Sequence, residues 1–327
     1  MKKQAVVLAV MAVMGSEAQA REGLTVYTYD SFVAEWGAGP KLEAAFEAHC
    51  ECDLKFVAAA DGAGIVNRLR IEGMNTKADV VLGMDDALMA TALAENLVQP
   101  HGLKHIEYAP ALQWQHESFI PFDYGYFAFI YDTERTPRPV GSLKALVDSG
   151  APVLYQDPRT STPGQGMLVW MNEVYGAGAP EAWTKLASHT VTVTKGWWEA
   201  YSLFLKGDAE YVLSYTTSPA YHQVVENSTR YKAAQFQEGH IMQVEVAGIS
   251  SHTRKKALAQ QFLTFLTSKE AQEIIPVTNW MLPVRTDVSL PKAFSSLIPA
   301  QKLPYDQARY SEQREQWLKQ WRFAASQ

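Results

Sequence analysis

The stretch LSYTTSPAY, residues 213–221, combines a strand-like start with groups that are poor material for a hydrophobic core. Tyr215 is followed by three consecutive hydroxyl residues, then by Pro219 and Tyr221. Each hydroxyl taken out of water needs a hydrogen-bond partner, and proline ends regular strand pairing. We therefore predict that this stretch lines a surface that contacts a polar, flat molecule.

Two other segments place acidic or hydroxyl residues where a helix is expected to start. Pro163 suits the first position of a helix that Ser161 or Thr162 would cap, and Asp61-Gly62 begins another helix in the same manner. The N–H groups at a helix start can bind an anion, but a plain cap is the commoner use of such residues. These residues alone leave both interpretations open.

Aromatic residues recur at positions that do not suit a core. Trp197 and Trp198 are adjacent at a predicted helix start, and neighbours on a helix diverge by roughly 100°, so one of them is expected to face a cleft. Trp280 lies in a segment without regular period. Together with Tyr29 and the two tyrosines of residues 213–221, these residues predict an aromatic-lined pocket, which suits flat or cationic ligands.

Patterns typical of enzymes are missing from the sequence. It has no nucleophile elbow, no Gly-rich phosphate loop with a lysine and no His-Glu-x-x-His, and its eight histidines are scattered. Asp85 and Asp86 form an obvious carboxylate pair. Neighbouring carboxylates after a strand are more often solvated or helix-capping than an acid/base dyad, so we predict no enzymatic activity.

The first twenty residues are typical of an export signal. Lys2 and Lys3 precede an apolar run over residues 5–14, and Ala18-Gln19-Ala20 forms a small-residue cleavage pattern, so cleavage is expected near Ala20. The run is too short to span a bilayer. Removing residues 1–20 takes away a net charge of +1 and changes the formal charge from -6 to -7, which argues against a nucleic-acid partner.

The two cysteines, Cys50 and Cys52, are separated by a single residue, Glu51. In an oxidising compartment a local disulfide is the leading interpretation, although it closes too short a loop to stabilise the fold much. A metal site completed by His49 is the less supported alternative, because no other cluster offers the remaining ligands.

The predicted elements alternate between strands and helices, which is typical of parallel α/β folds. A strand over 24–29, a helix from Gly39, a strand over 54–57, a helix capped by Asp61 and a strand over 78–82 begin the chain. Residues 121–130 predict a long strand or a segment that crosses between lobes. Further strands are expected at 153–155, 190–194, 211–215 and 244–247, and helices at 163–175, 198–205, 258–266 and 313–323.

Seven segments, in this order, resemble the periplasmic solute-binding proteins of ABC uptake systems, and within them the thiamine-binding members. They extend over nearly all of the chain after residue 20. The segments are LTVYTYDSF (24–32), LRIEGMNTKADVVLG (69–83), PFDYGYFAF (121–129), YQDPRTSTPG (155–164), TVTVTKGW (190–197), LSYTTSPAY (213–221) and NWMLPV (279–284).

The resemblance implies an α/β, two-lobed periplasmic binding protein fold, type II-like, with the ligand in a cleft between lobes joined by a hinge. Residues 21–125 and 241–300 would form lobe 1, residues 126–240 lobe 2, and residues 301–327 a C-terminal helical segment. A monomer is expected.

The resemblance also implies a ligand and its contacts. Thiamine, thiamine monophosphate and thiamine diphosphate would be captured unchanged, without a cofactor, and passed to a membrane permease of the ABC transporter. The rings suit the aminopyrimidine and the thiazolium cation, and the helix starts suit phosphate groups. The implied site residues are Tyr29, Asp61, Gly62, Ser161, Thr162, Trp197, Tyr215, Thr216, Thr217, Ser218, Tyr221 and Trp280.

Two alternative functions use a similar scaffold. A ferric-ion-binding protein would need paired tyrosinates with a carboxylate or histidine, and Tyr215 and Tyr221, six residues apart with a proline between them, do not obviously form such a pair. A thiamine-degrading enzyme would need a nucleophilic cysteine in the cleft. Both cysteines lie near the end of the first predicted helix, away from every predicted pocket segment.

Overall fold

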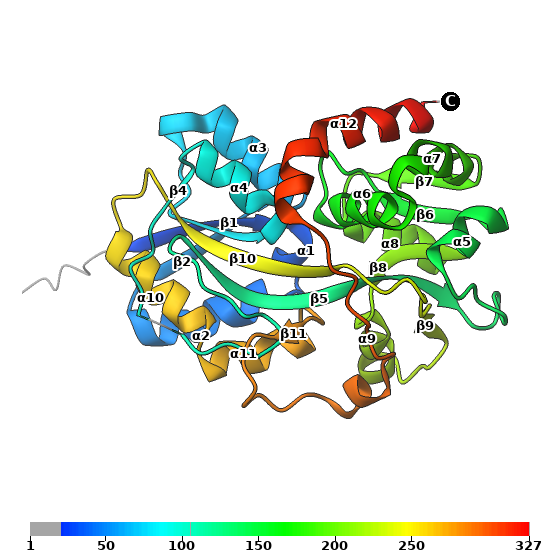
Figure 1. The fold of residues 1–327 in the computed structure, drawn as a ribbon. Coiled ribbons are helices and arrows are strands. Elements are labelled where there is room, and N and C mark those ends of the chain that lie inside the picture. Colours follow the sequence, from blue (N-terminus) through cyan, green and yellow to red (C-terminus); the bar gives the residue numbers. More distant parts are fainter. Residues whose placement is uncertain (1–20, 105, 327) are drawn as a thin grey trace, which may run out of the picture.

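The computed structural model describes residues 21–104 and 106–326, so the predicted export signal lies outside the described residues. Two groups of strands and helices lie toward the two ends of the long strands β5 (Phe119–Asp132) and β10 (Met242–Ser250), as Figure 1 shows. The strand order is β2-β1-β3-β10-β5-β8-β6-β7, with β4 (Val98–Gln99) beside β10. The mixed α/β, two-lobed fold is the predicted one.

The first lobe contains a parallel set of strands. These are β1 (Gly23–Tyr29), β2 (Asp53–Ala59) and β3 (Val80–Asp85). The helices between and after them are α1 (Asp30–Val33), α2 (Gly39–Cys50), α3 (Gly62–Glu72) with the short η1 (Gly73–Asn75), and α4 (Asp86–Ala94). Gly39 begins α2 and the Asp61 side chain caps α3, as predicted.

The second lobe repeats the alternation. Its parallel strands are β6 (Val153–Gln156), β7 (Thr190–Thr194) and β8 (Tyr211–Tyr215). Its helices are α5 (Leu143–Ser149), α6 (Thr162–Tyr175), η2 (Gly176–Gly178), α7 (Ala179–Ala187), α8 (Trp197–Lys206) and α9 (Ser218–Val225). Helix α6 begins at Thr162, so Pro163 occupies its second position rather than the predicted first.

Strand β5 belongs to both lobes. Its first part, over residues 119–126, pairs with β10 and β11 (Leu282–Pro283), and its second part, over residues 127–132, pairs with β8 and β9 (Tyr231–Ala233). The prediction of a long strand that crosses between lobes is confirmed. Because β10 returns the chain alongside β5, two adjacent strands connect the lobes (Figure 1).

The C-terminal third completes both lobes. Helices α10 (Lys256–Leu266) and α11 (Lys269–Ile274) contribute to the first core, and η3 (Ile275–Val277) and η4 (Lys292–Ser296) follow them. Helix α12 (Gln307–Ala325) begins upstream of the predicted position 313, because Asp306 caps it by accepting from the N–H groups of Ala308 and Arg309. It packs on α6 and α7 and also contacts α4.

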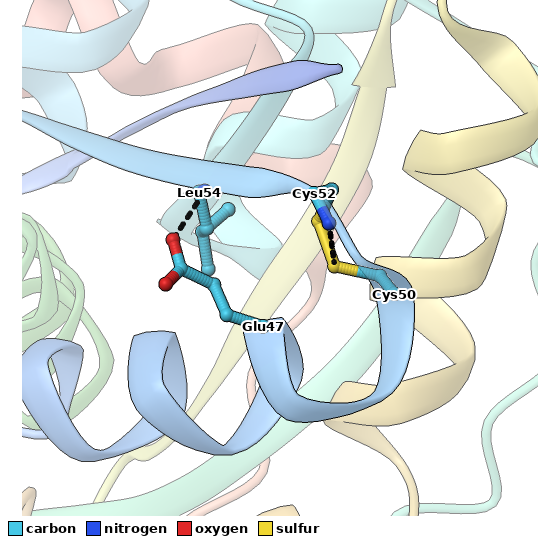
Figure 2. The surroundings of a disulfide bond; sticks show 4 residues. All are labelled: Glu47, Cys50, Cys52 and Leu54. Atoms are coloured by element: carbon cyan, nitrogen blue, oxygen red, sulfur yellow. Dashed lines mark hydrogen bonds between the residues drawn. A yellow bond between two sulfur atoms is a disulfide. The ribbon is translucent and has the colours of Figure 1, made fainter. Parts of the chain in front are cut away.

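Cys50 and Cys52 form a disulfide at the turn between α2 and β2, as predicted (Figure 2). In the same turn, the Leu54 N–H donates to Glu47 Oε1 at 2.8 Å. The alternative metal site is wrong: His49 pairs with Glu270, with 2.8 Å between Nε2 and Oε2, and the described residues contain no group of three or more His, Cys, Asp or Glu side chains that could hold a metal ion.

Across residues 21–104 and 106–326, no helix combines the length and the apolar character needed to cross a bilayer.

Candidate functional site

A cavity of about 180 Å³ is lined by residues from both lobes. Tyr29 is the last residue of β1 and Asp61 follows the carboxyl end of β2, while Thr162, Trp197 and Ser218 begin α6, α8 and α9 in the other lobe. In open α/β sheets, ligands bind beyond the carboxyl ends of the strands. The topology of both lobes therefore makes this cavity the candidate binding site.

The cavity brings together most of the predicted site residues. Gly62, Ser161, Thr216 and Thr217 do not line it and are buried next to residues that do. At Gly62 a Cβ atom would lie 2.5 Å from the Gly83 carbonyl oxygen and 2.6 Å from Thr162 Cγ2, so this glycine allows two helix starts to approach. The eight predicted residues that line the cavity are Tyr29, Asp61, Thr162, Trp197, Tyr215, Ser218, Tyr221 and Trp280.

Aromatic rings form much of the wall, as predicted, but more of them than the sequence indicated. Trp197 stacks on Tyr201 with ring centroids 5.1 Å apart, and Tyr221 meets Trp280 edge to face at 5.5 Å. The adjacent Trp198 also lines the cavity, so both neighbouring indoles face it. Trp36 and Tyr201 line the cavity as well, although the sequence did not predict it. Only the folded chain brings Trp36 to Trp198, with 4.8 Å between their ring centroids.

The hydroxyl residues of the 213–221 stretch hold the wall in place. The indole Nε1–H of Trp197 donates to Ser214 Oγ at 2.8 Å, and Ser214 and Ser218 share a hydrogen bond of 2.7 Å. Ser218 Oγ also accepts from the Tyr215 N–H. Pro219 lies in the first turn of α9. This polar stretch therefore holds the indole of Trp197 in position and contributes Tyr215 and Tyr221 to the cavity wall.

Asp61 joins the two lobes through an interaction that we call the inter-lobe latch, made of Asp61, Ser161 and Thr162. Ser161 Oγ donates to Asp61 Oδ2 at 2.7 Å, and Thr162 Oγ1 donates to Asp61 Oδ1 at 3.0 Å. Ser161 occupies the N-cap position of α6, as expected, but neither hydroxyl makes a capping hydrogen bond, because both donate to the Asp61 carboxylate. Asp61 itself caps α3 by accepting from the Gly62 N–H.

Glu245 of β10 is a cavity-lining residue that the sequence analysis missed. Its Oε2 accepts from the Tyr29 hydroxyl at 2.8 Å, and its Oε1 accepts from Gln243 Nε2 at 3.0 Å. Burial raises the pKa of Glu245 well above its usual value, and the charge of Asp123 raises it further. The only sequence signal for this residue was an acidic side chain within the apolar strand Val244-Glu-Val-Ala247.

Asp85, which is not among the lining residues, is 3 % exposed, so the prediction that it is solvated is wrong. Its alternative, helix capping, is confirmed: Asp85 Oδ1 accepts from the Leu88 N–H at the start of α4. Burial and the neighbouring Asp86 raise the pKa of Asp85 well above its usual value.

The lining residues carry only one sign of formal charge. Asp30, Asp61 and Glu245 contribute carboxyl groups, and the lining within the described residues includes no lysine, arginine or histidine. Aromatic faces attract cations through their quadrupoles. A flat cation is thus the solute class that matches these walls.

Two lobes joined by crossing strands around a cavity define the class of two-lobed solute-binding proteins. The family model of the bacterial extracellular solute-binding proteins matches residues 28–273, and the chain belongs to this family.

Close relatives share nearly the whole chain. It is 51% identical over 322 residues to the thiamine-binding periplasmic protein of Salmonella typhimurium, and this alignment covers 98% of each chain. It is 52% identical over 310 residues to the thiamine-binding periplasmic protein of Escherichia coli, and that alignment covers 94% of each chain. A solved structure of a periplasmic thiamin binding protein superposes with a TM-score of 0.92 at 51% identity, covering 94% of this chain and 97% of that one. A ferric binding protein from Campylobacter jejuni, at 16% identity and a TM-score of 0.77, shares the fold; the superposition covers 92% of this chain and 99% of that one.

Proposed function

We propose that this protein is the periplasmic solute-binding component of an ABC uptake system, which captures thiamine and delivers it to the membrane permease. The observation that carries the proposal is a cavity with aromatic walls and carboxyl groups but no cationic side chain. Thiamine is a flat cation with an aminopyrimidine ring and a thiazolium ring. The names of the relatives at 51% and 52% identity support the same ligand.

We further propose that thiamine monophosphate and diphosphate enter the same site. Residues that begin α6, α8 and α9 line the cavity. The N-cap residue of α8 is Gly196, so no N-cap side chain accepts a hydrogen bond from the first backbone N–H groups of this helix. With no cationic side chain in the lining, a phosphate would depend on backbone N–H groups and hydroxyls. We assign the eight lining residues to ligand contact, and Gly62, Ser161, Thr216 and Thr217 to shaping the site.

We propose the lobe boundaries given by the resemblance, and the strand pairing supports them. The partners of β5 change between Tyr126 and Phe127, close to the boundary at 125/126, and β10 begins at Met242, close to the boundary at 240/241. We propose that the protein is a monomer and that its two lobes close by moving about β5 and β10.

The alternative functions have less support. Tyr215 Oη donates to Gln243 Oε1, and the described residues hold no metal-binding cluster of His, Cys, Asp or Glu. The cysteine pair is oxidised and lies at the α2–β2 turn, outside the cavity lining, so it offers no nucleophile there.

Calorimetric titration of the ligand-stripped protein with thiamine and with thiamine diphosphate tests the proposal. We expect one-to-one binding with quenched tryptophan fluorescence, and intact ligand on recovery. Absence of binding by both compounds would overturn the thiamine assignment, while recovery of cleaved ligand would revive the enzyme alternative.

A further inference from the structure

Two buried carboxyl groups, Asp123 and Glu245, lie directly opposite each other where the lobes join; we call them the carboxyl pair. They are register partners on the antiparallel strands β5 and β10. Asp123 is 0 % exposed and Glu245 is 5 % exposed. Like charges directly opposite in a sheet are destabilising, and burial makes each charge more costly. The pair therefore needs either a proton or a positive partner.

Among the residues that the structure describes, no positive side chain acts on the pair. Neutral groups hydrogen bond to it: Tyr29 and Gln243 to Glu245, and Asn279 Nδ2 to Asp123 Oδ2 at 2.7 Å. Asp123 Oδ1 is buried and has no hydrogen-bond partner among the described residues.

The titratable groups that face the pair come from four other elements. They are Tyr29 of β1, Asp61 at the start of α3, Asp85 of β3 and Tyr215 of β8. Each of them is neutral or negative, so none compensates a negative charge on the pair. Burial accordingly raises the pKa of Asp123 to about 8, and that of Glu245 is raised well above its usual value.

The sheet is irregular beside Glu245. The register of β10 with β5 shifts between Glu245 and Val246, and its register with β3 shifts one residue later, opposite Gly83 with φ of +91°. Bulges of this kind redirect side chains and recur next to functional sites. Here one member of the pair, Glu245, reaches the cavity, while Asp123 does not line it.

We propose that the carboxyl pair is the counter-charge for the cation in the cavity, and that it releases a proton when the cationic ligand binds. In the empty protein a carboxyl O–H holds the proton. When the cation enters, this O–H bond breaks, the proton passes to solvent, and the remaining carboxylate faces the cation. The inference rests on the proposed function, because it assumes a cationic ligand such as thiamine.

Calorimetry with thiamine at pH 7, in buffers of different ionisation enthalpy, measures this proton directly. We expect a plot of observed binding enthalpy against buffer ionisation enthalpy to have a slope that corresponds to about one proton released per ligand. We also expect Kd to fall by up to about tenfold per pH unit as the pH rises from about 6 to about 8. Binding without either dependence would overturn the inference and leave the function intact. No binding in any buffer would instead overturn the function.

Two variants locate the source of the proton. Glu245→Gln keeps the size of the side chain but cannot ionise, so we expect weaker thiamine binding and loss of the proton release. Asp86→Asn is the matched control: burial raises the pKa of Asp86 to about 6, and it raises that of Glu245 as well, but Asp86 does not line the cavity. Proton release that survives in Glu245→Gln, or is lost in Asp86→Asn, would contradict the inference. If Glu245→Gln does not fold, Asp123→Asn and the wild-type buffer series still test it.

Discussion

At the scale of single residues, Trp280 combines strain with exposure to the cavity. Its φ of +57° lies in the left-handed region, which is uncommon for a residue with a bulky side chain. The Trp280 N–H donates to the Ile275 carbonyl at 3.2 Å, and the indole meets Tyr221 edge to face. Strained backbone of this kind persists where the surrounding structure holds it, often at ligand sites. We infer that the strain keeps the indole in the wall.

Replacing Trp280 by alanine should weaken thiamine binding by about tenfold or more, because the ligand loses an aromatic face. The stability of the free protein should change little, since the indole is only partly buried. Phe323→Ala is the control, because this ring is 67 % exposed on α12 and does not line the cavity. Titration calorimetry and thermal unfolding measure both effects. Equal affinities of the two variants would contradict the role of Trp280.

At the scale of elements, the inter-lobe latch ties the start of α3 to the start of α6. Its three residues are buried, so each hydrogen bond acts in a poorly hydrated setting where an unpaired group is costly. Burial raises the pKa of Asp61, and the hydroxyls of Ser161 and Thr162 oppose that shift by donating to its carboxylate. The latch therefore stabilises the arrangement of the lobes in this structure even before a ligand contributes contacts.

Removing both hydroxyls, with Ser161→Ala and Thr162→Val, should shift the ligand-free protein toward an open arrangement. We expect a larger radius of gyration by small-angle X-ray scattering, and thiamine binding weakened several-fold, because closure becomes less favourable. Thr184→Val on α7 serves as a control, since its hydroxyl bonds only to the Pro180 carbonyl within its own helix. An unchanged radius and affinity in the double variant would show that the latch does not bias closure.

At the scale of the whole molecule, two parallel α/β units are joined by β5 and β10, and α12 spans them. Tyr310, Trp317 and Trp321 of α12 are buried in the core of the second lobe, while Gln307 Nε2 donates to the Asp86 carbonyl in the first. The disulfide lies elsewhere, at the turn between α2 and β2 (Figure 2). Stability and ligand binding are thus distributed over the cores and the crossing strands.

Reduction of the Cys50–Cys52 disulfide should leave thiamine affinity unchanged. A bridge between residues only two apart removes little entropy from the unfolded chain, so the melting temperature should fall by no more than a few degrees. Titration and thermal unfolding with and without a reductant measure this, and the Cys50→Ser, Cys52→Ser variant checks for side effects of the reductant. A marked loss of binding would mean that the α2–β2 turn supports the cavity.

Much of the element order could be predicted because it depends on neighbours along the chain. The alternation in residues 24–29, the cap at Asp61 and the aromatic run after Pro121 each report a local preference, and the structure confirms them. The start of α12 was misplaced, because the sequence analysis located that helix from its apolar face and overlooked the cap at Asp306.

The sequence by itself determined much of the element order, the disulfide and most of the aromatic wall, because spacing and residue type suffice for these. Only the tertiary structure decided how polar groups are partnered. Asp61 meets Ser161 across 100 residues of chain, and Tyr29 meets Glu245 across 216. Contacts of this kind depend on strand register and on the placement of the lobes, which no local pattern encodes. For that reason the sequence left open whether the helix starts bind an anion, the fold shows that the hydroxyls of Ser161 and Thr162 donate to the Asp61 carboxylate, and the carboxyl pair became visible only in the fold.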